Sequence, residues 1–184
     1  MDVAVDRGAR IVVLGLNGAG KTTLLRLLAG LEQPDTGRGH ARATGCASAT
    51  TRRSTRRWTA SAPCWRTCAS AAPDLTDGEH RGILGSFLFS GDDVAKPAAV
   101  LSGGEKTRLA LALLVVSGAN VLLLDEPTNN LDPAQPGRRS SSALRRYRGA
   151  IVLVTHDEGA VEALAPERVI LLPDGVGGLH GARA

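Results

Sequence analysis

A glycine-rich stretch carries the most specific chemistry in the sequence. Residues 15–23 read GLNGAGKTT, so that Gly15, Gly20, Lys21 and Thr22 have the spacing of a phosphate-binding loop. Glycines let main-chain N–H groups converge on phosphate oxygens, and the helix that follows adds its positive N-terminal end. The alternative is an ordinary glycine turn with a solvated lysine. On the first interpretation the phosphates of a nucleotide are held by Asn17, Gly18, Ala19, Gly20, Lys21, Thr22 and Thr23.

Two carboxylates at the end of a later apolar run would complete this site. The run NVLLLDEP, residues 120–127, ends in Asp125 and Glu126, and open α/β folds bind ligands beyond the carboxyl ends of their strands. We expect Mg²⁺ to be held by the Thr22 hydroxyl and, through water, by Asp125. Glu126 is the candidate base that orients and deprotonates the attacking water. A carboxyl pair that only caps the next turn is the alternative.

Three further segments accompany the glycine loop. They read LSGGEKTRLALA at 101–112, DEPTNNLD at 125–132 and VTHD at 154–157. Together with the loop they resemble the signature motif, the Walker B and D-loop segment and the switch histidine of ATP-binding cassette (ABC) ATPases. The resemblance covers roughly residues 1–37, 70–133 and 149–175. It implies an α/β fold of the P-loop NTPase class in its ABC form, with a mostly parallel sheet and a short helical subdomain.

The resemblance also implies roles for the remaining motif residues. Ser102, Gly103 and Gly104 precede a helix, and in this family that helix end caps the γ-phosphate of ATP held by a second cassette. His156 would contact the γ-phosphate and the attacking water. The implied cofactors are ATP and Mg²⁺. The implied partner is a second cassette, either another copy of this chain or a missing N-terminal half.

Finer features favour one branch of the family. Transport cassettes commonly carry a signature that ends in Gln and a D-loop like SALD, whereas this chain has Glu105 and NNLD. About 80 residues separate Lys21 from Ser102, which leaves room for only a short helical region. These features resemble the ABC-F branch, whose members are twin-cassette ATPases that act on ribosomes. A cassette that energises a membrane transporter, through a permease, is the second interpretation, and a remnant without activity is the third.

The elements that must position these residues can be placed from apolar patterning. Apolar runs at 9–15, 120–127, 150–157 and 168–175 predict strands, and 21–31 has the spacing of a helix. Because helix-length sequence separates the strands, a parallel sheet is expected. We expect one partial cassette domain over residues 1–184, with a helical subdomain at 70–100.

Composition and charge exclude several classes of protein. The N-terminus MDVAVDR is not typical of a signal peptide, and the longest uncharged apolar stretch, 109–124, is too short to span a membrane. We therefore expect a cytoplasmic protein without direct membrane insertion. The net charge of +4 comes from residues 36–73, which hold seven arginines and no carboxylate. The rest of the chain has 15 basic and 18 acidic side chains, so it lacks the excess of positive charge that is typical of a nucleic-acid-binding protein.

Residues 38–69 are anomalous. They include ATTRRSTRRWTASAPCWRTC at 49–68 and all three cysteines, Cys46, Cys64 and Cys68, which we expect to be free thiols. The family's Q-loop glutamine should fall here, yet the only glutamines are Gln33, too early, and Gln135, after the D-loop. The family's aromatic residue that stacks on adenine would lie before Met1.

Three explanations of this segment remain open. A shifted reading frame in a GC-rich gene would produce such a composition, with a shorter shift at 135–142. An RNA-contacting insertion would use arginine pairs beside tryptophan to grip phosphates and stack on bases. A solvated loop is the third explanation. The coding DNA tests the first, because codons incompatible with a shift would exclude it.

Overall fold

Short runs of branched aliphatic residues form the strands of the computed structural model, which describes residues 3–36, 48–50, 61–127, 144, 147–173 and 175–177. The central strands are rich in Val, Ile and Leu, the composition expected where both faces of a parallel sheet are covered. The strands are β1 (Arg10–Gly15), β2 (Ser48–Thr50), β3 (Val121–Asp125), β4 (Ala150–Val154), β5 (Arg168–Leu172) and β6 (Gly175–Gly177).

These strands form one sheet within the described residues, in the order β2-β3-β4-β1-β5-β6. All neighbouring pairs are parallel except β5 and β6, which are antiparallel. Because parallel strands point the same way, β1, β3 and β4 end at one edge of the sheet. In the register of these pairs Val13 and Asp125 both lie opposite Val154.

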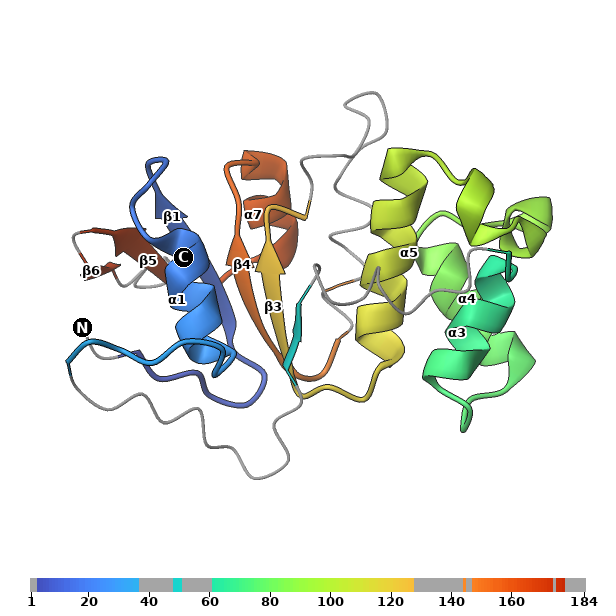
Figure 1. Ribbon diagram of the computed structural model, residues 1–184, viewed down its shortest axis with the longest axis horizontal. Coiled ribbons are helices and arrows are strands. Elements are labelled where there is room, and N and C mark those ends of the chain that lie inside the picture. Colours follow the sequence, from blue (N-terminus) through green and yellow to red (C-terminus); the bar gives the residue numbers. More distant parts are fainter. Residues whose placement is uncertain are drawn as a thin grey trace, which may run out of the picture.

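Alternate side chains of the strands divide the core into two layers. On one face Ile11 and Val13 pack with Leu25 of α1 (Lys21–Leu28). On the other face Val12 packs with side chains of α5 (Gly103–Val116) and α7 (Glu158–Leu164). The period of two along β1 thus sends consecutive residues into opposite layers. Figure 1 shows the result, with α1 in front of the sheet and α7 behind it.

A group of helices lies beyond the sheet and packs on α5. It consists of α3 (Cys64–Ala71), α4 (Asp77–Ser86) and the short 3₁₀ helices η2 (Gly91–Ala95) and η3 (Ala98–Val100). From Leu109 onward α5 is apolar on all sides, as expected of a helix covered both by a sheet and by other helices. Figure 1 shows α3 and α4 on the far side of α5 from the sheet. The core of this group includes Phe87, Phe89 and Leu84, which are almost completely buried.

The expected α/β fold with a mostly parallel sheet and helices to one side is confirmed. The strands expected at 150–157 and 168–175 are shorter than predicted, since β4 ends at Val154 and β5 at Leu172. After β5 the chain turns and returns as β6, which sequence patterning did not indicate. The three-residue strands β2 and β6 are too short to show a period.

Helix α3 begins inside the anomalous segment 38–69. Its Cys64 and Cys68 are free, fully buried and part of the apolar core. Burial raises the pKa of the Cys68 thiol to about 11. The prediction of free thiols is confirmed for these two residues, whereas Cys46 lies outside the described residues. The end of the anomalous segment therefore contributes folded structure to the helical group.

Every helix among the described residues falls short of the length and hydrophobicity that a membrane span needs.

We predict opposite effects of alanine at two glycines. A Cβ at Gly149 would collide with the carbonyl oxygen of Asn120, which accepts the amide N–H of Ala150, and with the Tyr147 hydroxyl. Gly149→Ala should therefore lower the free energy of unfolding by about 1–3 kcal/mol. At Gly82, an exposed position inside α4, a Cβ meets open space. Gly82→Ala should raise the free energy of unfolding by about 0.5–1 kcal/mol.

Urea denaturation of both variants beside the unaltered chain measures the two changes. Equal stability of the Gly149→Ala variant and the unaltered chain would contradict the packing of this corner between β3 and β4.

Candidate active site

The glycine loop after β1 adopts a conformation that depends on its glycines. Gly18 and Gly20 have φ of +84° and +91°, in the region that side chains rarely adopt. At Gly15 the constraint is close approach, because a Cβ there would lie 2.7 Å from the carbonyl oxygen of Leu172 at the end of β5. The loop then leads directly into α1, whose first residue is Lys21.

Lys21 turns back into the loop that precedes it. Its side chain is 9% exposed, and its ammonium donates to the carbonyl oxygens of Gly15 at 2.7 Å and Leu16 at 2.9 Å. The first amides of α1 have no intrahelical acceptors, as at any helix start. One positive side chain and several main-chain donors therefore meet in this loop, and this combination suits a bound phosphate.

Thr22 and Asp125 are brought together from distant parts of the chain. The Thr22 hydroxyl, in the first turn of α1, donates to the Asp125 carboxylate at 3.0 Å. A hydroxyl and a carboxylate are hard oxygen donors of the kind that Mg²⁺ prefers. Within the described residues no group of three or more His, Cys, Asp or Glu side chains could hold a metal ion. The pair thus fits a magnesium ion whose other ligands are water and phosphate oxygens, as in phosphoryl-transfer sites.

Glu126 follows Asp125 in an unusual backbone conformation. Its φ is +45°, and its amide N–H donates to the carbonyl oxygen of Val154 at 2.9 Å, so the backbone turns at the edge of the sheet. One carboxylate oxygen lies 3.0 Å from Nε2 of His156. The other, Oε2, is buried and has no partner among the described residues. A buried carboxylate oxygen with no partner is available to accept a hydrogen bond from water or substrate.

His156 reaches Glu126 from the end of the neighbouring strand. The buried Thr155 hydroxyl accepts the amide N–H of Asp157 at 3.0 Å, which fixes the turn after β4. Asp157 then caps α7, because its carboxylate accepts the amides of Gly159 and Ala160. The His156 side chain is 54% exposed, so it faces solvent while it contacts the carboxylate.

A second polar helix end is built at the start of α5. The Ser102 hydroxyl accepts the Glu105 amide at 3.2 Å, and the Glu105 carboxylate accepts the Ser102 amide at 2.8 Å. This reciprocal capping box holds the serine at the end of a helix whose first amides, those of Gly103 and Gly104, lack intrahelical acceptors. The hydrogen bond from the Ser102 amide lowers the pKa of Glu105, which keeps the carboxylate ionised.

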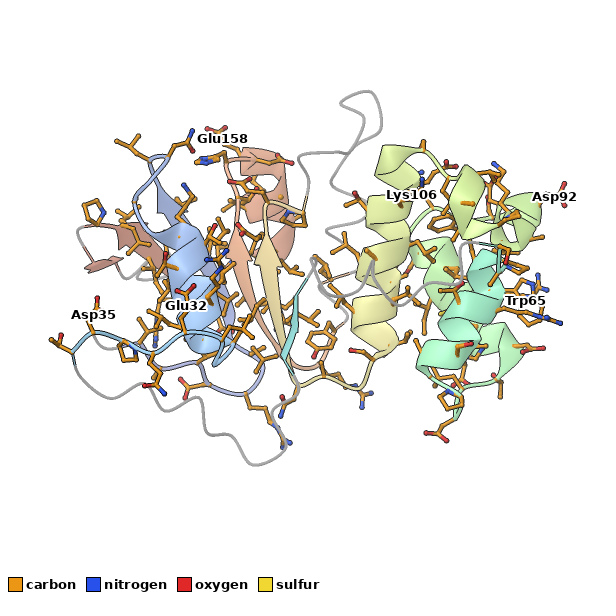
Figure 2. The ribbon with its side chains drawn as sticks, viewed as in Figure 1. Glu32, Asp35, Trp65, Asp92, Lys106 and Glu158 are labelled. Carbon is orange, nitrogen blue, oxygen red and sulfur yellow. The ribbon has the colours of Figure 1, made fainter. Side chains whose placement is uncertain are left out.

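The two polar ends face the same side of the molecule but lie apart. In Figure 1 the glycine loop lies on the left, between β1 and α1, and the start of α5 lies on the right, with β3 and β4 between them. Figure 2 labels Lys106 in the first turn of α5 and Glu158 at the start of α7, and shows this separation. The fold of one chain therefore keeps these two polar helix ends apart.

The structure brings five of the predicted side chains to one edge of the sheet. Thr22 contacts Asp125, His156 contacts Glu126, and Lys21 precedes Thr22 at the start of α1. Ser102, Gly103 and Gly104 form the separate helix end. The D-loop residues 129–132 lie outside the described residues.

Sequence patterning missed two charged residues beside this helix end. The Lys96 ammonium lies 2.6 Å from an Asp93 carboxylate oxygen and 3.9 Å from Glu105. The Asp-x-x-Lys spacing predicts the first contact on a helical turn. Lys96 lies between η2 and η3, nine residues before Glu105 of α5, and nothing in that spacing predicts the second contact.

Comparison with known proteins gives a consistent result. A family model described as ABC transporter matches residues 1–129. The chain is 35% identical over 167 residues to ATP-binding cassette sub-family F member 3 of Mus musculus, covering 91% of this chain and 23% of that protein. It is 36% identical over 169 residues to the energy-dependent translational throttle protein EttA of Haemophilus influenzae, covering 90% of this chain and 30% of that protein. The chain spans about a third or less of the length of such relatives.

The architecture is similar to that of solved nucleotide-binding cassettes. The dimeric cassette MJ0796, solved in a post-hydrolysis state with ADP and Pi, has a TM-score of 0.73 at 18% identity. The match covers 97% of this chain and 89% of that one. At this identity the likeness supports the fold.

Proposed function

Because this chain belongs to the ATP-binding cassette family, with relatives in sub-family F, we propose that it hydrolyses ATP in a site completed by a second cassette. The observation that carries the proposal is the meeting of Lys21, Thr22, Asp125 and Glu126 at one edge of the sheet. A cation, two oxygen ligands and a carboxylate oxygen without a partner among the described residues are groups suited to phosphoryl transfer to water.

Each group has a defined task in this proposal. Lys21 and the loop amides hold the β- and γ-phosphates. Thr22 and, through water, Asp125 would hold Mg²⁺, which would supply positive charge to neutralise the phosphates. Glu126 accepts a proton from the attacking water while the oxygen of that water bonds to the γ-phosphorus. The bond from that phosphorus to the bridging oxygen breaks, and ADP keeps the electron pair, so ATP and water yield ADP and phosphate. His156 orients the Glu126 carboxylate and faces the γ-phosphate.

The second helix end supports a requirement for a partner. Ser102, Gly103 and Gly104 present a hydroxyl and free amides at the start of α5, apart from the glycine loop of the same chain. We propose that they cap the γ-phosphate bound by a second cassette, either a second copy of this chain or a cassette that belongs to a longer protein. The dimeric structure of MJ0796 supports such pairing in this fold.

The biological role that we propose is in translation, in the cytoplasm. The supporting observation is the similarity to EttA, which is named an energy-dependent translational throttle protein. Glu105 in the signature motif agrees with this branch. A second candidate is the ATP-binding subunit of a transporter, favoured by the description of the matching family model. Cosedimentation with ribosomes in the presence of ATP tests the first candidate, and association with a permease tests the second.

We predict that Lys21→Ala weakens ATP binding about 10- to 150-fold. The substitution removes the buried ammonium, and one charge-assisted hydrogen bond to a phosphate oxygen is worth about 1.5–3 kcal/mol. Fluorescence titration with a labelled ATP analogue and Mg²⁺ measures the affinity. Arg26→Ala is the matched control, because Arg26 is an exposed cation on the same helix, paired with Glu32. Unchanged affinity of the Lys21 variant would mean that the loop does not hold the phosphates.

We also predict that Glu126→Gln lowers the turnover of ATP by about 10²- to 10⁴-fold and leaves nucleotide binding intact. The amide keeps the shape of the side chain but cannot accept the proton of water. Release of phosphate at saturating ATP measures turnover. Glu158→Gln, at the exposed start of α7, is the control. A Glu126 variant as fast as the unaltered chain would exclude this carboxylate as the base.

A further inference from the structure

A small network of charges lies beside the start of α5. The Lys96 ammonium lies between two carboxylates, at 2.6 Å from Asp93 and 3.9 Å from Glu105. Arg108, which is buried over the ring of Phe89, lowers the pKa of both carboxylates through its charge, as a lesser contribution. The two cations and two anions therefore balance to zero charge.

The Glu105 carboxylate divides its two oxygens between different partners. Oε2 accepts the Ser102 amide at 2.8 Å in the capping box, and Oε1 is the oxygen that faces Lys96. Lys96 thus lies near Oε1 of the same Glu105 carboxylate whose Oε2 accepts the Ser102 amide. Its charge can hold the carboxylate in the geometry that the capping box needs.

The backbone of Lys96 is fixed independently of its side chain. Its carbonyl oxygen accepts both the amide of Cys64 at 3.0 Å and the Cys64 thiol at 3.2 Å, at the start of α3. Ala98, two residues later, donates to the carbonyl of Ala62 at 3.0 Å. The ammonium is therefore attached to an anchored stretch of chain.

Glu105 also raises an electrostatic problem that Lys96 answers. A helix N-terminus attracts anions through its free amides and dipole. An ionised carboxylate in the first turn of α5 opposes the approach of a phosphate to the same end. A cation 3.9 Å from that carboxylate reduces the opposition, and the effect acts over short range because salt screens exposed charges.

From these contacts we infer that Lys96 is a positioning residue for the signature serine. It holds Glu105 in the capping box of Ser102 and offsets the negative charge that Glu105 brings to a phosphate-binding helix end. The role of the helix end in binding phosphate rests on the proposed function. The role of Lys96 in the capping box does not.

Amide hydrogen exchange of the chain without nucleotide tests the positioning role. In Lys96→Met the Glu105 amide, which donates to the Ser102 hydroxyl, should exchange about two- to fivefold faster, the range of an exposed ion pair. Lys106→Met is the matched control. Lys106 is an exposed lysine next to Glu105 in α5, and it forms no ion pair with any described residue. Lys96→Arg should restore slow exchange. Equal exchange in Lys96→Met and the unaltered chain would overturn the inference.

Steady-state ATP hydrolysis tests the consequence for phosphate. Lys96→Met should raise the half-saturating ATP concentration about two- to fivefold and leave the turnover at saturation nearly unchanged. In a Glu105→Gln background the same change should have no effect, because a glutamine caps the helix without a charge to offset. The difference should shrink at about 1 M salt, where screening acts within roughly 3 Å.

The outcomes separate the inference from the proposed function. An equal effect of Lys96→Met in both backgrounds, or of Lys106→Met and Lys96→Met, would overturn the electrostatic role. If the unaltered chain hydrolysed no ATP, the proposed function would fail, and hydrogen exchange would still decide whether Lys96 positions the capping box.

Discussion

Parallel pairing of β3, β4 and β1 is the constraint on which the rest of the site depends. The register sets Asp125 and Val13 on either side of Val154, so three strands end within a residue or two of one another. Asp125, Glu126 and His156 then lie within two residues of the end of a strand. Lys21 and Thr22 reach the same edge through the glycine loop and the start of α1. The Glu126 amide continues the hydrogen bonding to Val154 by one more residue and so fixes the carboxylate relative to the neighbouring strand. The pairing of the strands thus positions the backbone from which these side chains extend.

The helix end at Ser102 is held in place by local contacts instead of by strand pairing. It belongs to the helical group around α5 and is held by a local capping box. No hydrogen bond among the described residues joins it to the edge of the sheet. Its geometry is therefore independent of the hydrogen bonds that hold the cluster at the edge of the sheet.

Sequence patterning predicted the parts of the structure that rest on local chemistry. Glycine spacing identified the loop, and the apolar run before Asp125 and Glu126 placed both carboxylates at the end of a strand, as found. It failed where tertiary contacts decide. The pairing of Lys96 with Glu105 joins separate elements, and the burial of Cys64 and Cys68 follows from packing of α3 against α5, which a segment rich in arginine did not suggest. The capping box at Ser102 was visible in the sequence as Ser-x-x-Glu, a pattern that reports helix starts in general.

The close approach of Gly15 to Leu172 places the beginning of the glycine loop against the end of β5. The two segments are more than 150 residues apart in the chain, yet no side chain fits between them. A displacement of β5 would therefore also move the backbone at the start of the glycine loop.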